Sequence, residues 1–172
     1  MSSKEKCVLE IERKYIIKMP DIAILSMQES YSSSEILQIY LPSEKGETRR
    51  VRRRTYADRT KFIETRKIRI DSMSSTEIEM ELSEREFDSM AQTILEGTRP
   101  VEKIRHTFLY NDQLFEIDIY PEWQHTAIME TELANRDTKV AMPPFINIIK
   151  EVTGNKAYSN AAMSRIFPKE ET

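Results

Sequence analysis

The stretch VLEIERKYII, residues 8–17, decides how this chain folds. Glu10, Glu12 and Lys14 stand at every second position, and apolar residues fill most of the positions between them. Alternate side chains leave a β-strand on opposite faces, whereas the apolar residues of an amphipathic helix recur every three or four positions. The stretch is therefore predicted to be a strand with one charged and one apolar face. Taken alone, such a strand is typical of a protein surface, with its polar side in water.

The same alternation recurs along nearly the whole chain, so that about eight strands are predicted. Residues 35–41 form one of them, and the arginine-rich segment 47–70 divides into two strands joined near residues 57–60. Each strand sets a charged or polar face against a largely apolar one. The charged faces hold, in chain order, Arg50, Arg52 and Arg54; Lys67 and Arg69; Glu77, Glu79 and Glu81; Lys103 and Arg105; Glu116 and Asp118; and Glu130 and Glu132.

Only a few helices are predicted between these strands. Ser83 and Glu86 have the spacing of a capping box, which predicts a helix that starts there and ends near Gly97. Short helices are also expected over residues 21–30, 143–154 and 160–167, and a serine-rich turn over residues 30–34.

Charge is abundant but nearly balanced. The 172 residues include 26 Lys+Arg and 29 Asp+Glu, for a net charge of −3. Charges of both signs in these numbers indicate that they are set against one another, or against a bound polyanion and its metal ions. The balance predicts binding to neither nucleic acid nor a membrane. The length fits a single domain, residues 1–172, that is large enough to bury a core without disulfides.

Composition excludes several classes of protein. Cys7 is the single cysteine, which rules out an intrachain disulfide or a zinc cluster and is typical of a reducing compartment. Three glycines are too few for a P-loop or a dinucleotide-binding loop. The N-terminal sequence MSSKEKCVLE lacks the apolar core of a signal peptide, and no apolar run reaches the roughly 18 residues of a membrane span. We therefore expect a cytoplasmic protein.

The strands are expected to close into a barrel. A flat sheet of this kind would leave two exposed edges, and closing the sheet removes both. If the charged faces point inward, the apolar faces can pack beneath the helices outside. The fold class predicted is therefore α+β: an eight-stranded antiparallel β-barrel, or tunnel, with a charged interior and helices packed outside it.

A charged interior needs partners, because isolated buried charges cost several kcal/mol each. Arginine and lysine suit phosphate oxygens, and carboxylates suit hard ions such as Mg²⁺ or Mn²⁺. The two sets of residues together predict a metal-assisted phosphate site. The basic set comprises Lys14, Arg50, Arg52, Arg54, Lys67, Arg69, Lys103 and Arg105, and the acidic set Glu10, Glu12, Glu116, Asp118, Glu130 and Glu132.

These motifs resemble those of the CYTH superfamily, the triphosphate tunnel metalloenzymes. EIERKY, residues 10–15, is similar to the family's ExExK signature, and the further matches follow in the family's order over nearly the whole chain. They are Arg50-Val51-Arg52, Thr65-Arg66-Lys67, Glu77-Ile78-Glu79, Lys103-Ile104-Arg105, Glu116-Ile117-Asp118, Glu130-Thr131-Glu132 and, in the closing segment, Lys156, Tyr158 and Asn160.

The resemblance implies a metal-dependent enzyme that hydrolyses a small-molecule triphosphate. The compact bacterial inorganic triphosphatases are the most similar members in length and motif order, so inorganic tripolyphosphate is the expected substrate. A class IV-type adenylate cyclase, a thiamine triphosphatase and a non-catalytic sensor of polyphosphate or nucleotide stay open as alternatives. The sequence also leaves open which metal is preferred and whether the chain forms a homodimer.

The resemblance also suggests a role for each site residue. Lys14, Glu10 and Glu12 are expected at the catalytic centre, and the acidic set is expected to bind Mg²⁺ or Mn²⁺. Glu77, Glu79 and Glu81 are expected as further tunnel carboxylates. Two departures, Ser75 and Ala157, stand where many relatives carry a basic residue and are expected to thin the positive lining. The residues expected to bind phosphate are Arg50, Arg52, Arg54, Lys67, Arg69, Lys103, Arg105 and Lys156.

Overall fold

Strand β1, Lys6–Lys18, is the strand on which the sheet closes. The structure is a computed structural model that describes residues 6–171. The first half of β1 pairs with β5, Ser74–Leu82, and its second half pairs with β8, Thr126–Glu132. A short strand, β9, Ile148–Glu151, pairs with the other edge of that second half. One long strand thus joins elements from the middle and the end of the chain.

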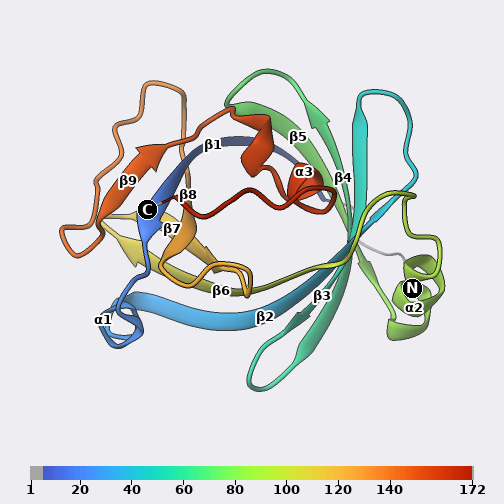
Figure 1. Cartoon of the computed structure of the whole chain (residues 1–172), viewed down its shortest axis with the longest axis horizontal. Helices are drawn as coiled ribbons and strands as arrows, with labels where there is room; N and C mark the ends of the chain where they lie inside the picture. The colour runs from blue at the N-terminus through green and yellow to red at the C-terminus, as the bar shows by residue number, and fades with distance from the viewer. Residues whose placement is uncertain (1–5, 172) are drawn as a thin grey trace.

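The remaining strands complete a closed antiparallel barrel (Figure 1). Neighbouring strands follow the order β5-β4-β3-β2-β6-β7-β8-β1, and the β1–β5 pairing closes the ring. Within residues 6–171 the barrel has eight strands, with β9 as an extra strand outside the ring. The predicted barrel is confirmed. The bounds not yet given are β2, Glu29–Leu41; β3, Glu47–Thr55; β4, Thr60–Arg69; β6, Val101–Tyr110; and β7, Gln113–Ile119.

The helices are short and few. α1 spans Ile22–Ser26, α2 spans Glu84–Ala91, and α3 spans Asn160–Met163 after a 3₁₀ turn, η1, at Lys156–Tyr158. The capping box at the start of α2 is present as predicted, because Ser83 accepts from the Glu86 backbone N–H and Glu86 accepts from the Ser83 backbone N–H. None of the helices in the described part of the chain has the length and apolar character needed to cross a bilayer.

Two segments predicted as a turn and a helix are strands, so those predictions are wrong. Residues 30–34 lie within β2, where a bulge that includes Ser30 at φ 53° is followed by regular pairing with β6. Residues 148–151 form β9 instead of a helix, since the edge of β1 beyond its contact with β5 offers free backbone partners. In both places tertiary pairing overrides the local sequence signal.

The end of α2 also differs from the prediction. The helix ends at Ala91, six residues before Gly97, although Gly97 does adopt a positive φ of 75°. The backbone N–H of Leu95 donates to the carbonyl of Tyr40, and the Leu95 side chain packs beside Tyr40 at one end of the barrel. These contacts draw the chain away from the helix axis.

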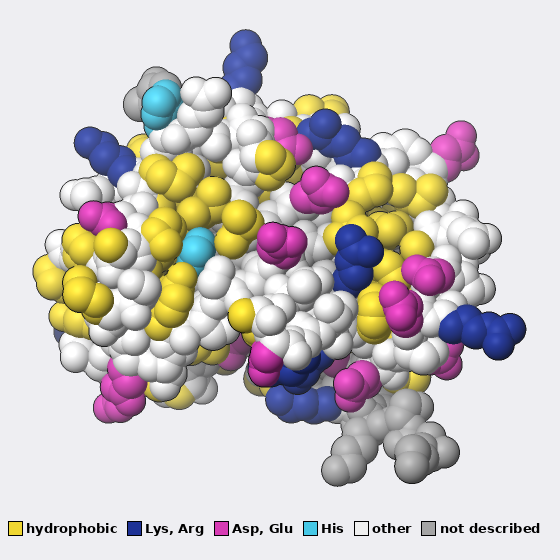
Figure 2. Space-filling model, turned by 90° about the horizontal axis from the view of Figure 1, so that it is seen from below, with side chains coloured by type: hydrophobic (Ala, Val, Ile, Leu, Met, Phe, Trp, Pro, Cys, Tyr) yellow, Lys and Arg dark blue, Asp and Glu magenta, His cyan; other side chains and the backbone are white. Residues whose placement is uncertain are grey.

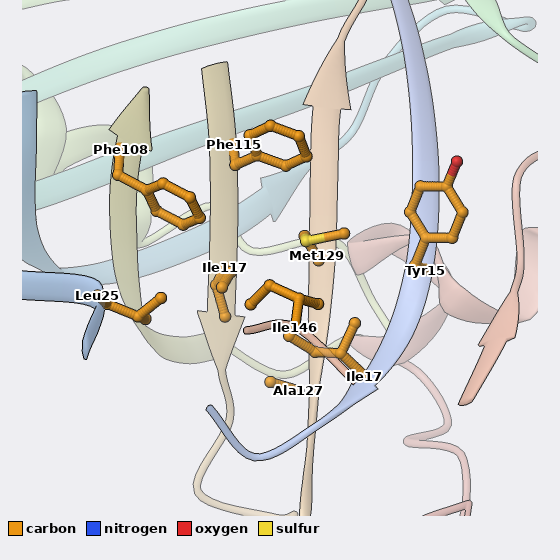
Figure 3. Close-up of a cluster of buried hydrophobic side chains, with 9 residues drawn as sticks. All are labelled: Tyr15, Ile17, Leu25, Phe108, Phe115, Ile117, Ala127, Met129 and Ile146. Atoms are coloured by element: carbon orange, nitrogen blue, oxygen red, sulfur yellow. The ribbon is translucent and has the colours of Figure 1, made fainter. Parts of the chain in front are cut away.

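The apolar strand faces pack outside the barrel in two clusters. The first gathers side chains of β1, β6, β7 and β8 with Leu25 of α1 and Ile146 of the segment before β9 (Figure 3). The second gathers side chains of β2, β3 and β5 beneath Phe87 of α2. The alternation therefore leaves the opposite, charged faces to line the interior.

A third apolar cluster fills one end of the barrel interior. Ile16, Tyr40 and Ile128 share their strand faces with Lys14, Gln38 and Glu130, so they point inward. The closing segment covers them with Val152, Tyr158 and Met163. The interior is therefore apolar at one end and charged over the rest of its length.

Figure 2 shows one face of the exterior. On the face drawn, charged side chains of both signs are scattered among patches of hydrophobic and uncharged polar residues. No large field of one sign gathers there, and the concentrated charge of this protein lies inside the barrel.

Candidate active site

A cavity of about 640 Å³ occupies the charged part of the barrel. Its walls come from the inward faces of the strands and from the closing segment, residues 152–165. The structure brings most of the predicted site residues together in this lining: Glu10, Glu12, Lys14, Arg50, Arg52, Arg54, Lys67, Arg69, Glu77, Glu79, Arg105, Glu116, Glu130, Glu132 and Lys156.

Three predicted site residues lie outside the lining. Glu81 is exposed near the end of β5, two residues after Glu79. Lys103 and Asp118 are buried against each other, with side chains 2% and 1% exposed. They belong to the same strand faces as Arg105 and Glu116, but they lie deeper, next to Tyr120 at the apolar end.

Most carboxylates of the cavity are paired with a cation. Lys67 Nζ lies 2.8 Å from Glu10 and 2.9 Å from Glu77, and Lys14 Nζ lies 2.7 Å from Glu130. Burial alone would raise the pKa of Glu77, but Arg50 and Lys67 lower it to about 2. These ion pairs hold the side chains in fixed positions inside the barrel.

Glu12 and Glu132 are the exception. They stand directly opposite each other on β1 and β8, and neither makes an ion pair with the residues described. Burial raises the pKa of both carboxyl groups, and a neighbouring carboxylate raises each further, Glu130 for Glu12 and Glu116 for Glu132. Like charges placed directly opposite in a sheet are destabilising, and the nearby cations, Lys14 and Lys67 for Glu12 and Arg105 for Glu132, offset this repulsion only in part.

The pair suits a hard divalent cation. Within residues 6–171 no three acidic, histidine or cysteine side chains converge as a ready metal site. Mg²⁺, however, is often bound by one or two carboxylates together with water and substrate phosphates. Glu12 and Glu132 supply two oxygen donors without a cation, with Glu10 and Glu130 beside them on the same strand faces. The donor set therefore fits Mg²⁺ or Mn²⁺.

The opposite wall carries two arginines that are each paired with a carboxylate of β5: Arg50 Nη2 lies 3.6 Å from Glu77 and Arg52 Nη2 lies 2.6 Å from Glu79. Arg50 and Arg52 are adjacent on the inward face of β3, and the Nε–H group of each is buried without a hydrogen-bond partner among the described residues. Burial lowers the pKa of Arg52 to about 10, and the charge of Arg50 adds to that effect. A buried donor left without a partner costs about 1–3 kcal/mol. An anion in the cavity would reach these Nε–H groups only if the two side chains turned toward it.

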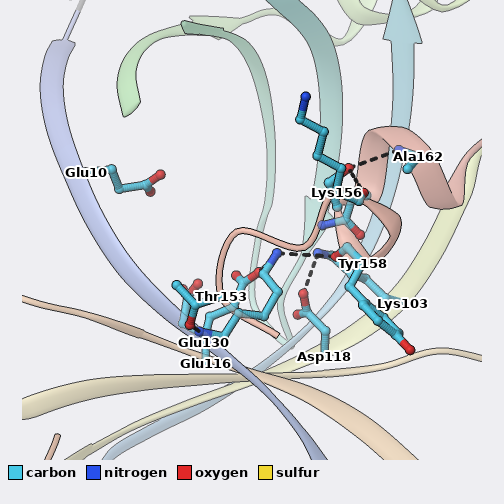
Figure 4. A network of polar contacts seen from close by, with 12 residues as sticks. Glu10, Lys103, Glu116, Asp118, Glu130, Thr153, Lys156, Tyr158 and Ala162 are labelled. Atoms are coloured by element: carbon cyan, nitrogen blue, oxygen red, sulfur yellow. Dashed lines mark hydrogen bonds and ion pairs between the residues drawn. The ribbon is translucent and has the colours of Figure 1, made fainter. Parts of the chain in front are cut away.

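The closing segment contributes Thr153 and Arg165, which the sequence reasoning did not find, beside the motif residues Lys156, Tyr158 and Asn160. The backbone N–H of Lys14 donates to Thr153 Oγ1 at 3.1 Å, and Lys14 Nζ donates to the Tyr158 carbonyl at 3.4 Å. Thr153, Asn160 and Arg165 also line the cavity (Figure 4 shows Thr153 and Tyr158). The motif around Lys156 was the available signal, but it did not reveal that β9 carries this segment over the barrel.

The two departures lie outside the cavity lining. Ser75 is buried on β5 opposite Glu10, and Ala157 is exposed in η1. Neither side chain belongs to the residues that line the cavity. The expectation that they thin its positive lining stays untested.

Comparison with known proteins fits this geometry. No family model and no curated protein matches the chain. Among solved structures, the inorganic triphosphatase NE1496 is 27% identical with a TM-score of 0.60, over 94% of this chain and 98% of that chain. The chain has a CYTH triphosphatase-like fold.

Two further solved structures share this fold at lower sequence identity, and their similarity to this chain supports the fold only. The PH1819 protein of Pyrococcus horikoshii OT3 is 20% identical with a TM-score of 0.55, over 74% of this chain and 80% of that chain. A "putative adenylate cyclase" of Vibrio parahaemolyticus is 11% identical with a TM-score of 0.51, over 74% and 79%.

Proposed function

We propose that this CYTH-like protein hydrolyses inorganic tripolyphosphate in the presence of Mg²⁺ or Mn²⁺. The observation that carries the proposal is the division of the cavity into two parts. Arg50 and Arg52, whose Nε–H groups have no partner among the described residues, lie on β3, and Glu12 and Glu132, which form no ion pair there, lie on β1 and β8. A metal–triphosphate complex would satisfy both parts at once. The resemblance in structure to a triphosphatase supports an enzymatic role.

The side chains divide the work of binding and positioning. Arg50 and Arg52 would hold phosphate oxygens, because guanidinium groups suit them in geometry and charge. Arg105 would add positive charge and its one remaining Nη1–H group, since its other N–H groups bind Glu116, Asp118 and Glu130. Glu12 and Glu132 would hold the metal, which when bound neutralises phosphate charge and lowers the pKa of the attacking water. Phosphoryl transfer depends mainly on such positioning and charge neutralisation.

Lys14 would link the two parts of the cavity. Its Nζ is held by Glu130 and by the Tyr158 carbonyl, so its position is fixed by β8 and by the closing segment. Its pKa is raised: burial alone would lower it, but the charges of Glu130 and Glu12 outweigh that effect. Lys14 therefore stays protonated and can stabilise negative charge on the departing phosphate.

The aromatic content of the cavity favours an inorganic substrate over a nucleotide or thiamine triphosphate. Tyr40 is the one aromatic side chain among the described residues of the lining, and it is buried, with its hydroxyl accepting from Gln38. Adenylate cyclase or thiamine triphosphatase activity would call for a ring that stacks on the base or on thiamine. No ring in this lining is free to do so.

The first experiment measures phosphate release from tripolyphosphate, ATP and thiamine triphosphate in parallel, with Mg²⁺, Mn²⁺ or EDTA. We expect metal-dependent release that is fastest with tripolyphosphate. The ATP reactions are also assayed for cyclic AMP, which as the main product would identify a cyclase. Tight binding of tripolyphosphate without turnover under any condition would overturn the hydrolase and identify a sensor.

Two variants test the two parts of the cavity. Glu12→Gln is expected to abolish metal-dependent turnover with the fold intact, and unchanged activity would remove this residue from the metal site. Arg52→Ala is expected to raise KM by roughly tenfold or more, since a charged hydrogen bond is lost. Arg53→Ala is the matched control, because Arg53 is adjacent but exposed on the opposite face of β3. An equal KM for both arginine variants would contradict the assignment.

A further inference from the structure

Lys103 and Asp118 form a buried ion pair below the cavity. Lys103 Nζ lies 2.5 Å from Asp118 Oδ2, and neither residue lines the cavity. Figure 4 shows Lys103 and Asp118 close together among the polar residues of this region. A phosphate or a metal ion in the cavity would reach neither group directly in this arrangement.

Both oxygens of Asp118 are occupied by cations. Arg105 Nε donates to Oδ1 at 2.6 Å and Arg105 Nη2 donates to Oδ2 at 2.7 Å, and Oδ2 also accepts from Lys103. Arg105 does line the cavity, with its side chain 8% exposed. Asp118 therefore fixes the plane of the guanidinium from behind and has no oxygen left for a metal.

The charge count explains the need for Lys103. Lys14, Lys103 and Arg105 are the cations of one connected network, and Glu116, Asp118 and Glu130 are its anions. Three charges of each sign leave the network neutral. Without Lys103 the same network would carry an excess negative charge a few ångströms from the phosphates, in a buried region where charges are poorly screened.

We propose that Lys103 and Asp118 are positioning residues and not ligands of phosphate or metal: Asp118 orients the Arg105 guanidinium, and Lys103 keeps the surrounding network from becoming net negative. The inference rests on the proposed function for its substrate, tripolyphosphate. It differs from the role that the sequence motifs suggest for these two residues, which is direct contact with phosphate for Lys103 and with metal for Asp118.

The test is a charge-rescue cycle. Lys103→Met removes the cation at similar side-chain length and is expected to raise KM for tripolyphosphate by roughly tenfold. In the Asp118→Asn background the network stays neutral without Lys103, so Lys103→Met is expected to raise KM there by less than half as much, on a logarithmic scale, as in the wild-type protein. If Lys103 bound phosphate directly, its loss would raise KM equally in both backgrounds, and that result would overturn the proposal. Lys150→Met, which removes an exposed lysine paired with Glu171, is the control and should leave KM unchanged.

Metal binding tests the role of Asp118 independently of turnover. The affinity for Mn²⁺ is measured by electron paramagnetic resonance with no substrate present. Asp118→Asn is expected to leave this affinity within about twofold, whereas Glu132→Gln should weaken it by roughly tenfold or more. Equal losses in the two variants would make Asp118 a ligand and overturn the proposal.

Two measurements keep the outcome interpretable. Thermal unfolding checks each variant, and if Lys103→Met fails to fold, the double variant is compared with Asp118→Asn alone, where the proposal predicts a similar KM and direct phosphate binding by Lys103 predicts a higher one. If the wild-type protein hydrolyses no triphosphate, the proposed function fails. Calorimetric dissociation constants of tripolyphosphate then replace KM in the same cycle, and rescue or its absence decides the proposal as before.

Discussion

Glu12 and Glu132 face each other across β1 and β8 with no cation between them in the described structure. The neighbouring carboxylates each form an ion pair, whereas these two are offset only by more distant cations and, at the exposed Glu132, by water, so some electrostatic strain stays at this point of the fold. A metal ion would remove that strain. Binding and stability are therefore coupled at two side chains.

The strain predicts how the stability of the metal-free protein depends on pH. The pKa values of Glu12 and Glu132 are raised in the folded state, so the fold favours their protonated forms. Their favourable contribution is complete below the unfolded pKa of 4.5 and is lost as the pH rises through the folded pKa values. We expect Glu132→Gln to remove part of this loss and to raise the melting temperature in EDTA at pH 7 by at most about 2 °C, because Glu132 is exposed and water screens its charge.

Thermal unfolding between pH 4 and pH 8 in EDTA measures this effect. Glu81→Gln is the control, because Glu81 is exposed near the end of β5 and should change little. Adding Mn²⁺ should raise the melting temperature of the wild-type protein more than that of Glu132→Gln, so that the wild-type protein becomes the more stable of the two. If the melting temperature of Glu132→Gln depends on pH as that of the wild-type protein does, Glu132 does not destabilise the metal-free fold.

The sequence could predict the face of each charged side chain but not its depth. Period-two alternation determines the face, and it correctly places Arg50, Arg52 and Glu116 in the cavity lining. Depth depends on the stagger between neighbouring strands and on what fills the barrel end, which alternation does not encode. For that reason Lys103 and Asp118 looked like cavity residues and are instead buried beneath it.

At the scale of elements, the junction between β9 and η1 is tightly constrained. Gly154 there has φ 74°, and a Cβ atom on it would lie 2.9 Å from Ser72 Cβ and 3.2 Å from the Ser72 carbonyl oxygen. Both residues line the cavity, so the closing segment and the turn between β4 and β5 meet at this point. The contact holds the wall formed by the closing segment in place.

Substitution of Gly154 is expected to disturb this wall. Gly154→Ala should lower the free energy of unfolding by about 1–2 kcal/mol for the left-handed backbone and by about 1–3 kcal/mol more for the clash. Gly46→Ala is the matched control, since Gly46 has φ 85° but open space around its Cβ position. Urea unfolding measures both, and equal losses would show that the chain relaxes around Ser72.

Element types were predictable where local pattern and tertiary pairing agree. The capping box at Ser83 and the strands over residues 47–70 are such cases. Residues 30–34 and 148–151 are the opposite case, because serines and the flanking prolines suggest other structures locally. Their hydrogen bonds go to β6 and β1, which are far away in the sequence.

At the scale of the whole molecule, the interior is a set of charges balanced largely by one another. A metal–tripolyphosphate complex would connect the arginines of β3 with the carboxylates of β1 and β8, three strands distributed around the ring. Ligand binding should therefore stabilise the whole barrel rather than one loop.

Thermal unfolding with tripolyphosphate and Mn²⁺ together tests this expectation. At a ligand concentration of one hundred times Kd, linkage predicts about 2.7 kcal/mol of added stability, or roughly 5–10 °C in melting temperature. Tripolyphosphate without metal should raise the melting temperature less, and Arg52→Ala should reduce the rise that tripolyphosphate and Mn²⁺ produce together. If tripolyphosphate and Mn²⁺ together leave the melting temperature unchanged, the result argues against binding within the barrel.

The triple pairing of β1 also has a consequence for how the protein folds. Residues 6–18 pair with residues 74–79, 126–132 and 148–151, so β1 joins segments that are more than 60 residues away in β5 and more than 100 residues away in β8 and β9. Such non-local contacts slow folding, because loop entropy is lost before the contacts form. The hairpins from β3 to β5 and from β6 to β8 can form early, whereas β1 completes the ring last. Until it does, the opposite edges of these hairpins stay open to pairing between chains, so refolding at high concentration should favour aggregation.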